Sequence, residues 1–244
     1  MKIVAISDVH VKKPHDEADK LLLSFLNHSE VQSSDYIVFL GDIFDLMCGP
    51  HEEYAESYSH LFNLIEELHS KNKKIFFFEG NHDLHLEKLF EKVWTKKVMT
   101  ISQKPIVEEI DGKKYYFSHG DEHEVDNLSY HRYMKIVRSN PLKFVANHLM
   151  PYKVLKFIGE RASKMSRKRG SRSFDADLVR ETFRQGVKQT TEGKFDFVLG
   201  GHSHVQDQYK IPGSEGTYLN NGYALHTRTF ILIENHLTRF EPLP

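Results

Sequence analysis

The chain has 244 residues, enough for one large domain or a domain with an insertion, and its formal net charge of -1 shows no overall basic bias toward nucleic acid. Hydrophobic residues make up 39% and charged residues 27%, an ordinary soluble balance, and no apolar run is long enough to span a membrane. The single cysteine, Cys48, excludes an internal disulfide and fits a reducing cytoplasm.

Short apolar runs rich in β-branched and aromatic residues predict five strands, over residues 3–6, 36–40, 75–78, 115–117 and 195–199. Helical periodicity lies between them, over residues 16–26 and 58–68. This alternation of strand and helix predicts an α/β fold. Residues 217–219, 229–233 and 237–240 predict an antiparallel terminal set of strands.

The block from 122 to 190 has no clear strand run and a helical pattern throughout. We therefore predict a core made of residues 1–121 and 191–244, interrupted by a helical insertion over 122–190.

Five polar clusters follow the predicted strands, and each offers Asp, Asn or His. They are Asp8-Val9-His10, Gly41-Asp42-Ile43-Phe44-Asp45, Gly80-Asn81-His82-Asp83, His119-Gly120-Asp121 and Gly200-Gly201-His202-Ser203-His204. Because sites in α/β folds lie at the carboxyl ends of strands, we expect the clusters to converge on one sheet edge. These side chains are hard or borderline metal ligands, so the pattern predicts a metal-dependent hydrolytic site. One cluster alone would be weak evidence, since a lone histidine is more often a hydrogen-bonded structural residue.

The clusters, in this order, resemble those of the calcineurin-like metallophosphoesterases. The resemblance implies a sandwich of two mixed sheets flanked by helices, with two metal ions at one sheet edge. It implies that one ion takes Asp8, His10, Asp42 and His204, and that the other takes Asn81, His119, His202 and the shared Asp42.

A phosphate ester repels an anionic nucleophile, so its charge must first be neutralised. Two neighbouring cations can bind the phosphoryl oxygens and lower the pKa of a water molecule. Mixed oxygen and nitrogen ligands suit Mn²⁺, Fe²⁺ or Zn²⁺, and we expect Mn²⁺ to serve. By resemblance, His82 is the general acid or transition-state stabiliser, and Asp45 orients it. A helix N-cap or turn is the structural alternative for Asp45. We assign Asp83 to a turn or cap and leave Asp121 open.

The predicted insertion combines an apolar block with a basic one. Residues 153–172 carry eight Lys or Arg against the single acid Glu160, and apolar residues lie just upstream and within this stretch. Such a surface suits a ligand with acyl chains and phosphates, or an anionic membrane face. The alternative is a helical hairpin that packs its apolar side on the core and exposes a solvated basic face.

His119-Gly120-Asp121, Asp126, Tyr130, Arg132 and Tyr133, followed by a helical insert, resemble the UDP-2,3-diacylglucosamine hydrolases of lipid A synthesis. These enzymes release UMP and a lipid-sugar 1-phosphate, and their insert forms a lid for the acyl chains. Many members have Arg where this chain has His82. The resemblance implies a cytoplasmic protein, peripheral at the inner membrane face, and substrate contacts from Asn81, Tyr130, Arg161, Ser163, Lys164 and Ser166.

Two other functions stay open at this point. The same chemistry could act on another phosphodiester or nucleotide substrate, or the fold could be a non-catalytic scaffold. The scaffold is disfavoured because scaffolds of this kind lose ligands, whereas all seven positions are filled here.

Overall fold

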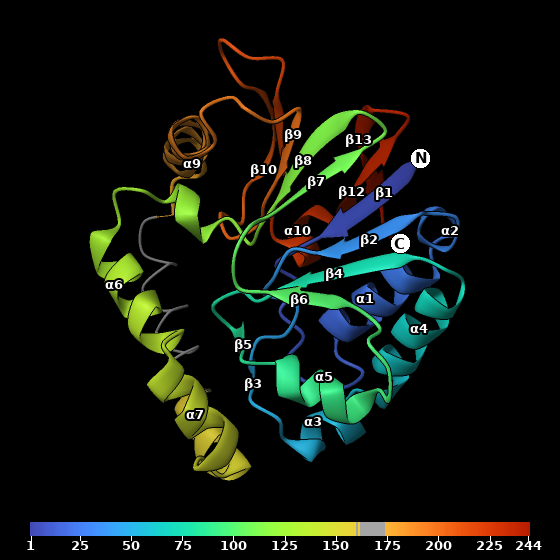
Figure 1. Ribbon diagram of the computed structural model, residues 1–244, viewed down its shortest axis with the longest axis vertical. Helices are drawn as coiled ribbons and strands as arrows, with labels where there is room; N and C mark the ends of the chain where they lie inside the picture. Colours follow the sequence, from blue (N-terminus) through green and yellow to red (C-terminus); the bar gives the residue numbers. More distant parts are fainter. Residues whose placement is uncertain (160, 162–173) are drawn as a thin grey trace.

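The computed structural model describes residues 1–159, 161 and 174–244, and two sheets pack face to face at its centre (Figure 1). The six-stranded sheet has the order β13-β12-β1-β2-β4-β6, and the five-stranded sheet has the order β10-β11-β9-β8-β7. The first contains β1 (Lys2–Ile6), β2 (Tyr36–Phe39), β4 (Lys74–Phe78), β6 (Thr100–Ser102), β12 (Thr229–Glu234) and β13 (Leu237–Pro242). The second contains β7 (Ile106–Ile110), β8 (Lys113–Phe117), β9 (Phe197–Leu199), β10 (Gln206–Lys210) and β11 (Thr217–Asn221).

Helices cover the outer faces of both sheets (Figure 1). Their bounds are α1 (Glu17–Asn27), α2 (Ser29–Gln32), α3 (Glu52–Ser57), α4 (Ser59–Ser70), α5 (Glu87–Val93), η1 (Asp121–His123), α6 (Leu128–Val137), α7 (Asn140–His148), α9 (Ala176–Thr191) and α10 (Ala224–Thr227). Residues 152–159 are also helical, and β3 (Met47–Cys48) pairs with β5 (Asp83–Leu84). None of the helices in these described ranges is long and apolar enough to cross a bilayer.

Alternation of side chains along the strands divides the core into layers. Ile3 and Ala5 of β1 pack with Phe117 of β8 and Leu199 of β9 between the sheets. Val4, which points the other way, joins the cluster that includes the apolar residues of α1 and α4. On the far side, Val187 of α9 packs on Val198 and Tyr218 of the second sheet. The predicted α/β sandwich with outer helices is therefore confirmed.

The strands β1, β2, β4 and β6 run parallel, so their carboxyl ends meet at one edge, on the side where α6 and α7 lie (Figure 1). The predicted antiparallel terminal set was wrong for residues 217–219. Strand β11 pairs with β10 and runs parallel to β9 in the second sheet, whereas β12 and β13 form an antiparallel pair on the first. Residues Tyr218 to Asn221 are all buried. A strand that is buried on both faces is expected inside a sheet with a parallel neighbour rather than in a terminal antiparallel pair.

Helix α6, helix α7, residues 152–159 and helix α9 occupy the described part of 122–190, and no strand lies in that part. The division of the chain into core and insertion remains a prediction.

Candidate metal centre

The ligand-bearing turns hold five non-glycine residues at positive φ. They are Asp8 (51°), His10 (54°), Asp42 (52°), His202 (66°) and His204 (58°). This backbone region costs an L-residue about 1–3 kcal/mol and persists only where surrounding contacts enforce it. Such a concentration of strained residues at one sheet edge is typical of a functional site.

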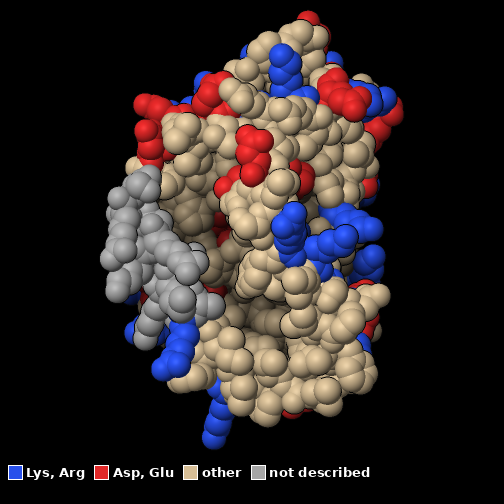
Figure 2. All heavy atoms as spheres, turned by 90° about the vertical axis from the view of Figure 1, so that its left-hand side faces the viewer, with Lys and Arg blue, Asp and Glu red and all other residues tan. Residues whose placement is uncertain are grey.

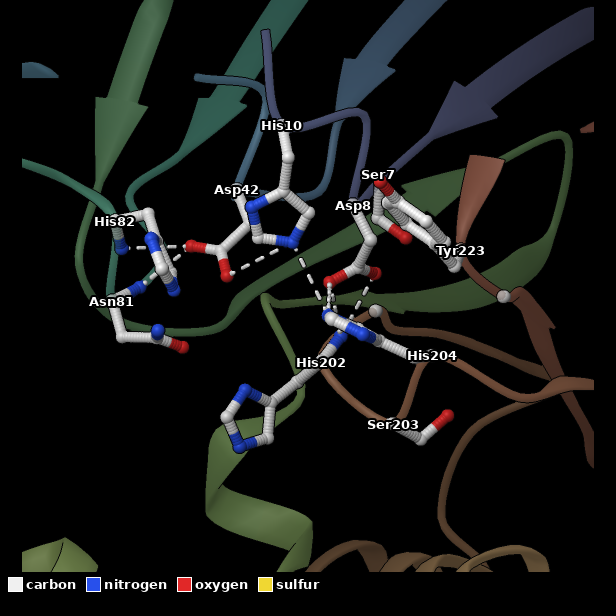
Figure 3. A network of polar contacts seen from close by, with 12 residues as sticks. Ser7, Asp8, His10, Asp42, Asn81, His82, His202, Ser203, His204 and Tyr223 are labelled. Carbon is white, nitrogen blue, oxygen red and sulfur yellow. Dashed lines mark hydrogen bonds and ion pairs between the residues drawn. The ribbon is translucent and has the colours of Figure 1, made fainter. Parts of the chain in front are cut away.

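Asp8, His10, Asp42 and His204 place one potential ligand atom each within 4.8 Å of one another (Figure 3). The Nε2 atoms of His10 and His204 lie 3.2 Å apart, and His204 Nε2 lies 3.3 Å from Asp8 Oδ1. This mixed set of two carboxylates and two imidazoles suits Mn²⁺, Fe²⁺ or Zn²⁺. It is the group that the family resemblance implies for the first ion.

The second predicted group surrounds the other oxygen of Asp42. Asp42 Oδ2 lies 3.8 Å from His10 Nε2, whereas Asp42 Oδ1 lies 3.9 Å from His119 Nε2. His119 Nε2 is also 3.4 Å from Asn81 Oδ1, and the rings of His119 and His202 have centres 5.0 Å apart. One carboxylate therefore faces both groups, as a bridging ligand would.

The packing around Asp42 fits a bound cation. A side chain at Gly80 would place its Cβ 2.1 Å from Asp42 Oδ1, so only glycine leaves that carboxylate room. Together with the donor set, this close packing supports a centre for divalent metal.

The ionisation of His10 and Asp42 favours metal binding, whereas that of His202 and His204 opposes it. Burial lowers the pKa of both these histidines, but the carboxylates of Glu124 and Asp8 raise it above the usual value, so the two imidazoles must lose a proton to bind a cation. Burial lowers the pKa of His10 to about 4, which leaves the imidazole neutral and able to ligate. Burial opposes ionisation of Asp42, but the imidazoles of His82, His119 and His10 hold its pKa below the usual range.

His82 lies beside both groups of proposed metal ligands. Its contact with Asp45 differs from the prediction, because the backbone of Asp45 and not its carboxylate bonds to the ring. The His82 ring shares a 2.8 Å hydrogen bond between its Nδ1 and the backbone carbonyl of Asp45. The Asp45 carboxylate lies 4.0 Å from His82 Nδ1 and slightly nearer, at 3.7 Å, to His10 Nδ1. The Asp45 carboxylate can therefore influence His10 as well as His82. The catalytic roles assigned to His82 and Asp45 remain predictions.

Asp83 supports the turn that carries Asp42. Its buried carboxylate accepts backbone N–H groups from Gly80 at 2.7 Å, Ile43 at 2.7 Å and Asp42 at 3.1 Å. This agrees with a structural role rather than a ligand role.

The predicted substrate contacts are placed unequally. The hydroxyl of Tyr130 donates to Asn81 Oδ1 at 3.3 Å, which puts α6 at the edge of the site. The Arg161 guanidinium lies over the Phe157 ring, 4.6 Å from its centre, and the described contacts do not join it to the ligands. Ser163, Lys164 and Ser166 lie outside the described residues.

Two neighbours of the site escaped sequence reasoning. Glu124 Oε2 lies 3.5 Å from His202 Nε2, and the Tyr223 ring stacks on His204 with centres 5.5 Å apart (Figure 3). Glu124 comes three residues after Asp121 in an irregular segment, and only its nearness to the His119 cluster could have drawn attention to it. Tyr223 follows Asn221 and Gly222, which predict a loop. The sequence does not show that this loop brings Tyr223 next to His204.

The model of the calcineurin-like phosphoesterase family matches residues 1–206, and the chain belongs to this family. It is a metal-dependent phosphoester hydrolase, and its Asp and His cluster could bind metal.

Several curated proteins are similar over most of the chain. The UDP-2,3-diacylglucosamine hydrolase of Histophilus somni (strain 129Pt) is 26% identical over 86% of this chain and 87% of its own length. The protein of the same name from Aliivibrio fischeri (strain MJ11) is 23% identical over 94% of this chain and 100% of its own length. A structure described as a novel archaeal phosphodiesterase aligns over 100% of both chains with a TM-score of 0.52 and 16% identity, which shows a shared fold.

Proposed function

We propose that the protein hydrolyses the pyrophosphate of UDP-2,3-diacylglucosamine to UMP and a lipid-sugar 1-phosphate. The observation that carries this proposal is a large exposed apolar surface beside the candidate metal centre. The names of the similar curated proteins support the same substrate class.

The apolar surface covers α6, α7 and residues 152–159. Its exposed side chains are Leu128, Tyr133, Ile136, Leu142, Phe144, Leu149, Val154, Phe157 and Ile158. The face in Figure 2 shows few charged residues over the lower part, where α7 lies, and a hollow lies above it. So many large exposed apolar side chains on neighbouring helices are uncommon on a soluble protein and indicate a binding surface, which acyl chains would fill. Tyr130 of the same helix α6 reaches Asn81, so this surface adjoins the centre.

The bound ions, which we propose to be Mn²⁺, would neutralise phosphoryl charge and make a water more acidic. Asp8, His10, Asp42 and His204 would hold one, and Asn81, His119, His202 and Asp42 the other. The protein would hold the water and the pyrophosphate in position. The water oxygen would then form a bond to one phosphorus while the bond from that phosphorus to the bridging oxygen breaks. His82 would stabilise charge that develops on the phosphoryl oxygens or the leaving group, and its bond to the Asp45 carbonyl fixes the ring.

We also propose that this surface meets the anionic inner face of the cytoplasmic membrane, where such a substrate resides. Apolar side chains would enter the interface, and the basic stretch of the insertion would pair with lipid headgroups. Vesicles of phosphatidylethanolamine with phosphatidylglycerol should sediment the protein more than phosphatidylethanolamine alone, and added salt should weaken the effect. Equal recovery in the supernatant with both vesicles would contradict the membrane proposal.

Release of UMP tests the substrate directly. Purified protein with Mn²⁺ should release UMP from UDP-2,3-diacylglucosamine, and UDP-N-acetylglucosamine, which lacks the two long acyl chains, should be a much poorer substrate. No turnover of the lipid substrate, with rapid hydrolysis of bis(p-nitrophenyl) phosphate or another nucleotide, would favour the alternative phosphodiesterase function.

A further inference from the structure

A pocket of about 240 Å³ lies next to the candidate metal centre. Asp45 and Leu46, which directly follow the turn of Asp42, form one wall. The pocket is smaller than the roughly 300–1,000 Å³ of a complete ligand site, so it suits one portion of an extended substrate.

Three lysines line the pocket together with the carboxylate of Asp45. Lys12, Lys13 and Lys156 line it, and all three are exposed. The hydrogen bonds and ion pairs of the described residues do not engage their ammonium groups. Asp16, the nearest acid along the chain, instead accepts the backbone N–H groups of Lys12 and Lys13 and thereby fixes the turn that presents them. Three ammonium groups beside a single carboxylate leave an excess of positive charge at this pocket, which favours a phosphate.

The pocket also has an aromatic part. Tyr54, Tyr58 and Tyr152 line it, and the rings of Tyr54 and Tyr152 meet edge to face with centres 5.2 Å apart. Tyr54 and Tyr58 are buried, whereas Tyr152 is partly exposed and its ring lies below the ammonium group of Lys156. Aromatic rings stack on nucleobases, and Tyr152 is the tyrosine of this pocket that a base can reach.

A long acyl chain fits this pocket poorly, because its polar rim would have to be desolvated without compensation. The exposed apolar side chains of α6 and α7 offer a better surface for the chains. A pyrophosphate that joins a nucleoside to a lipid would thus meet the lysine-lined pocket on one side of the metal centre and the apolar surface of α6 and α7 on the other.

We propose that the Lys12–Lys13–Lys156 pocket binds the nucleotide portion of the substrate, with the lysines on its phosphate and Tyr152 against its base. This inference rests on the proposed function and deepens it, since it separates the nucleotide side of the site from the lipid side.

The test measures UMP affinity by calorimetry on the full chain loaded with Mn²⁺. Lys12→Met and Lys156→Met keep the apolar stem and remove the charge, and each should weaken UMP binding about tenfold. Lys153→Met is the matched control, because Lys153 is an exposed lysine in the same helical stretch that does not line the pocket. In Lys153→Met, both UMP affinity and the hydrolysis of bis(p-nitrophenyl) phosphate should be unchanged.

Equal UMP affinity in the wild type, Lys12→Met and Lys156→Met would overturn the inference. So would weaker binding of the lipid-sugar 1-phosphate with unchanged binding of UMP, since the lysines would then serve the lipid product. Because UMP binding needs no turnover, the two proposals can fail separately. Protein that binds UMP with the expected lysine dependence but does not cleave UDP-2,3-diacylglucosamine would refute the proposed function alone.

Discussion

The backbone N–H of Asp42 donates to the carboxylate of Asp83 at 3.1 Å, so two buried carboxylates share one turn beside the candidate metal centre. Burial and the negative charge of Asp42 raise the pKa of Asp83 well above its ordinary value. The backbone N–H groups of Gly80, Ile43 and Asp42 oppose that shift. The turn is therefore electrostatically crowded, and cations beside Asp42 would relieve it.

Asp42→Asn should abolish catalysis without unfolding the protein. The amide cannot bridge two cations with full charge, so turnover should fall by about 10³-fold or more. The metal-free variant should be as stable as the wild type or more stable, because the repulsion between Asp42 and Asp83 is removed. Hydrolysis of bis(p-nitrophenyl) phosphate, metal content and thermal melting check these points. Wild-type turnover in Asp42→Asn would contradict the proposed bridge.

Gly201→Ala should disturb the centre, whereas Gly200→Ala should not. A Cβ at Gly201 would lie 2.6 Å from Ser7 Cβ and 2.7 Å from Asp8 Oδ2, so the turn or the Asp8 carboxylate must move. The nearest atom to a Cβ at Gly200 is Gly120 Cα at 3.5 Å, an ordinary contact. We expect Mn²⁺ affinity to fall by about 10–100-fold in Gly201→Ala, as it does when ligands lose their supports. Equal Mn²⁺ titrations of the two variants would contradict this reading of the turn.

The layers of the fold and the convergence of the clusters could be predicted because both follow local rules. Residues 3–6 and 36–40 are continuous apolar runs, as strands buried on both faces must be. Polar strands were harder to predict: in β7, Val107 is exposed beside two glutamates, and in β10 Gln206, Gln208 and Lys210 alternate around a buried Asp207. Edge strands of this kind carry no apolar signature.

The partners of the site depend on tertiary packing and could not be predicted in the same way. The Asp45 carboxylate lies at similar distances from His10 and His82, which sequence spacing cannot resolve. Glu124 reaches His202 only because η1 and α9 pack together near the end of β9. Arg138, at the C-terminal end of α6, pairs with Asp121 at the start of η1, which makes Asp121 an ion-pair partner.

His82→Gln should lower kcat with little effect on metal binding. The His82 ring bonds to the Asp45 carbonyl, and His82 is not among the proposed ligands. Loss of a positioned transition-state donor costs about 10²–10³-fold in kcat. His60→Gln is the control, because His60 bonds to Asp19 away from the centre and its loss should leave kcat unchanged. Full metal loss in His82→Gln, with kcat restored by excess Mn²⁺, would instead make His82 a ligand.

Arg138→Met should destabilise the fold through Asp121. The Arg138 Nη1 donates to Asp121 Oδ2 at 2.8 Å, and the exposed fraction of the Asp121 side chain is only 8%. Removing the partner leaves a buried carboxylate, at a cost of about 3 kcal/mol in the free energy of unfolding. The double variant with Asp121→Asn should recover part of that loss in urea titrations.

The pH dependence of the same pair has a definite sign. Burial opposes ionisation of Asp121, but His119 and Arg138 lower its pKa below the ordinary value. A depressed carboxyl pKa adds stability above the unfolded pKa of about 4, and this stability is lost as the pH falls through the folded pKa. The difference in the free energy of unfolding between wild type and Arg138→Met should therefore become smaller in acid. A constant difference from pH 7 to pH 3 would show that lost packing, not charge, causes the effect.

Cys48 should resist thiol reagents while the protein is folded. Burial, reinforced by the charge of Glu79, raises the pKa of the Cys48 thiol to about 12. Because the thiolate is the reactive form, a fraction of only about 10⁻⁴ is available at pH 8, against roughly a quarter for a free thiol with a pKa near 8.5. Iodoacetamide should therefore label native protein at least about 10³-fold more slowly than glutathione at pH 8, and the rate should climb as the pH rises. Protein unfolded in guanidinium chloride serves as the control and should react at the rate of a free thiol, whereas native labelling as fast as that of glutathione would contradict the raised pKa of this partly exposed thiol.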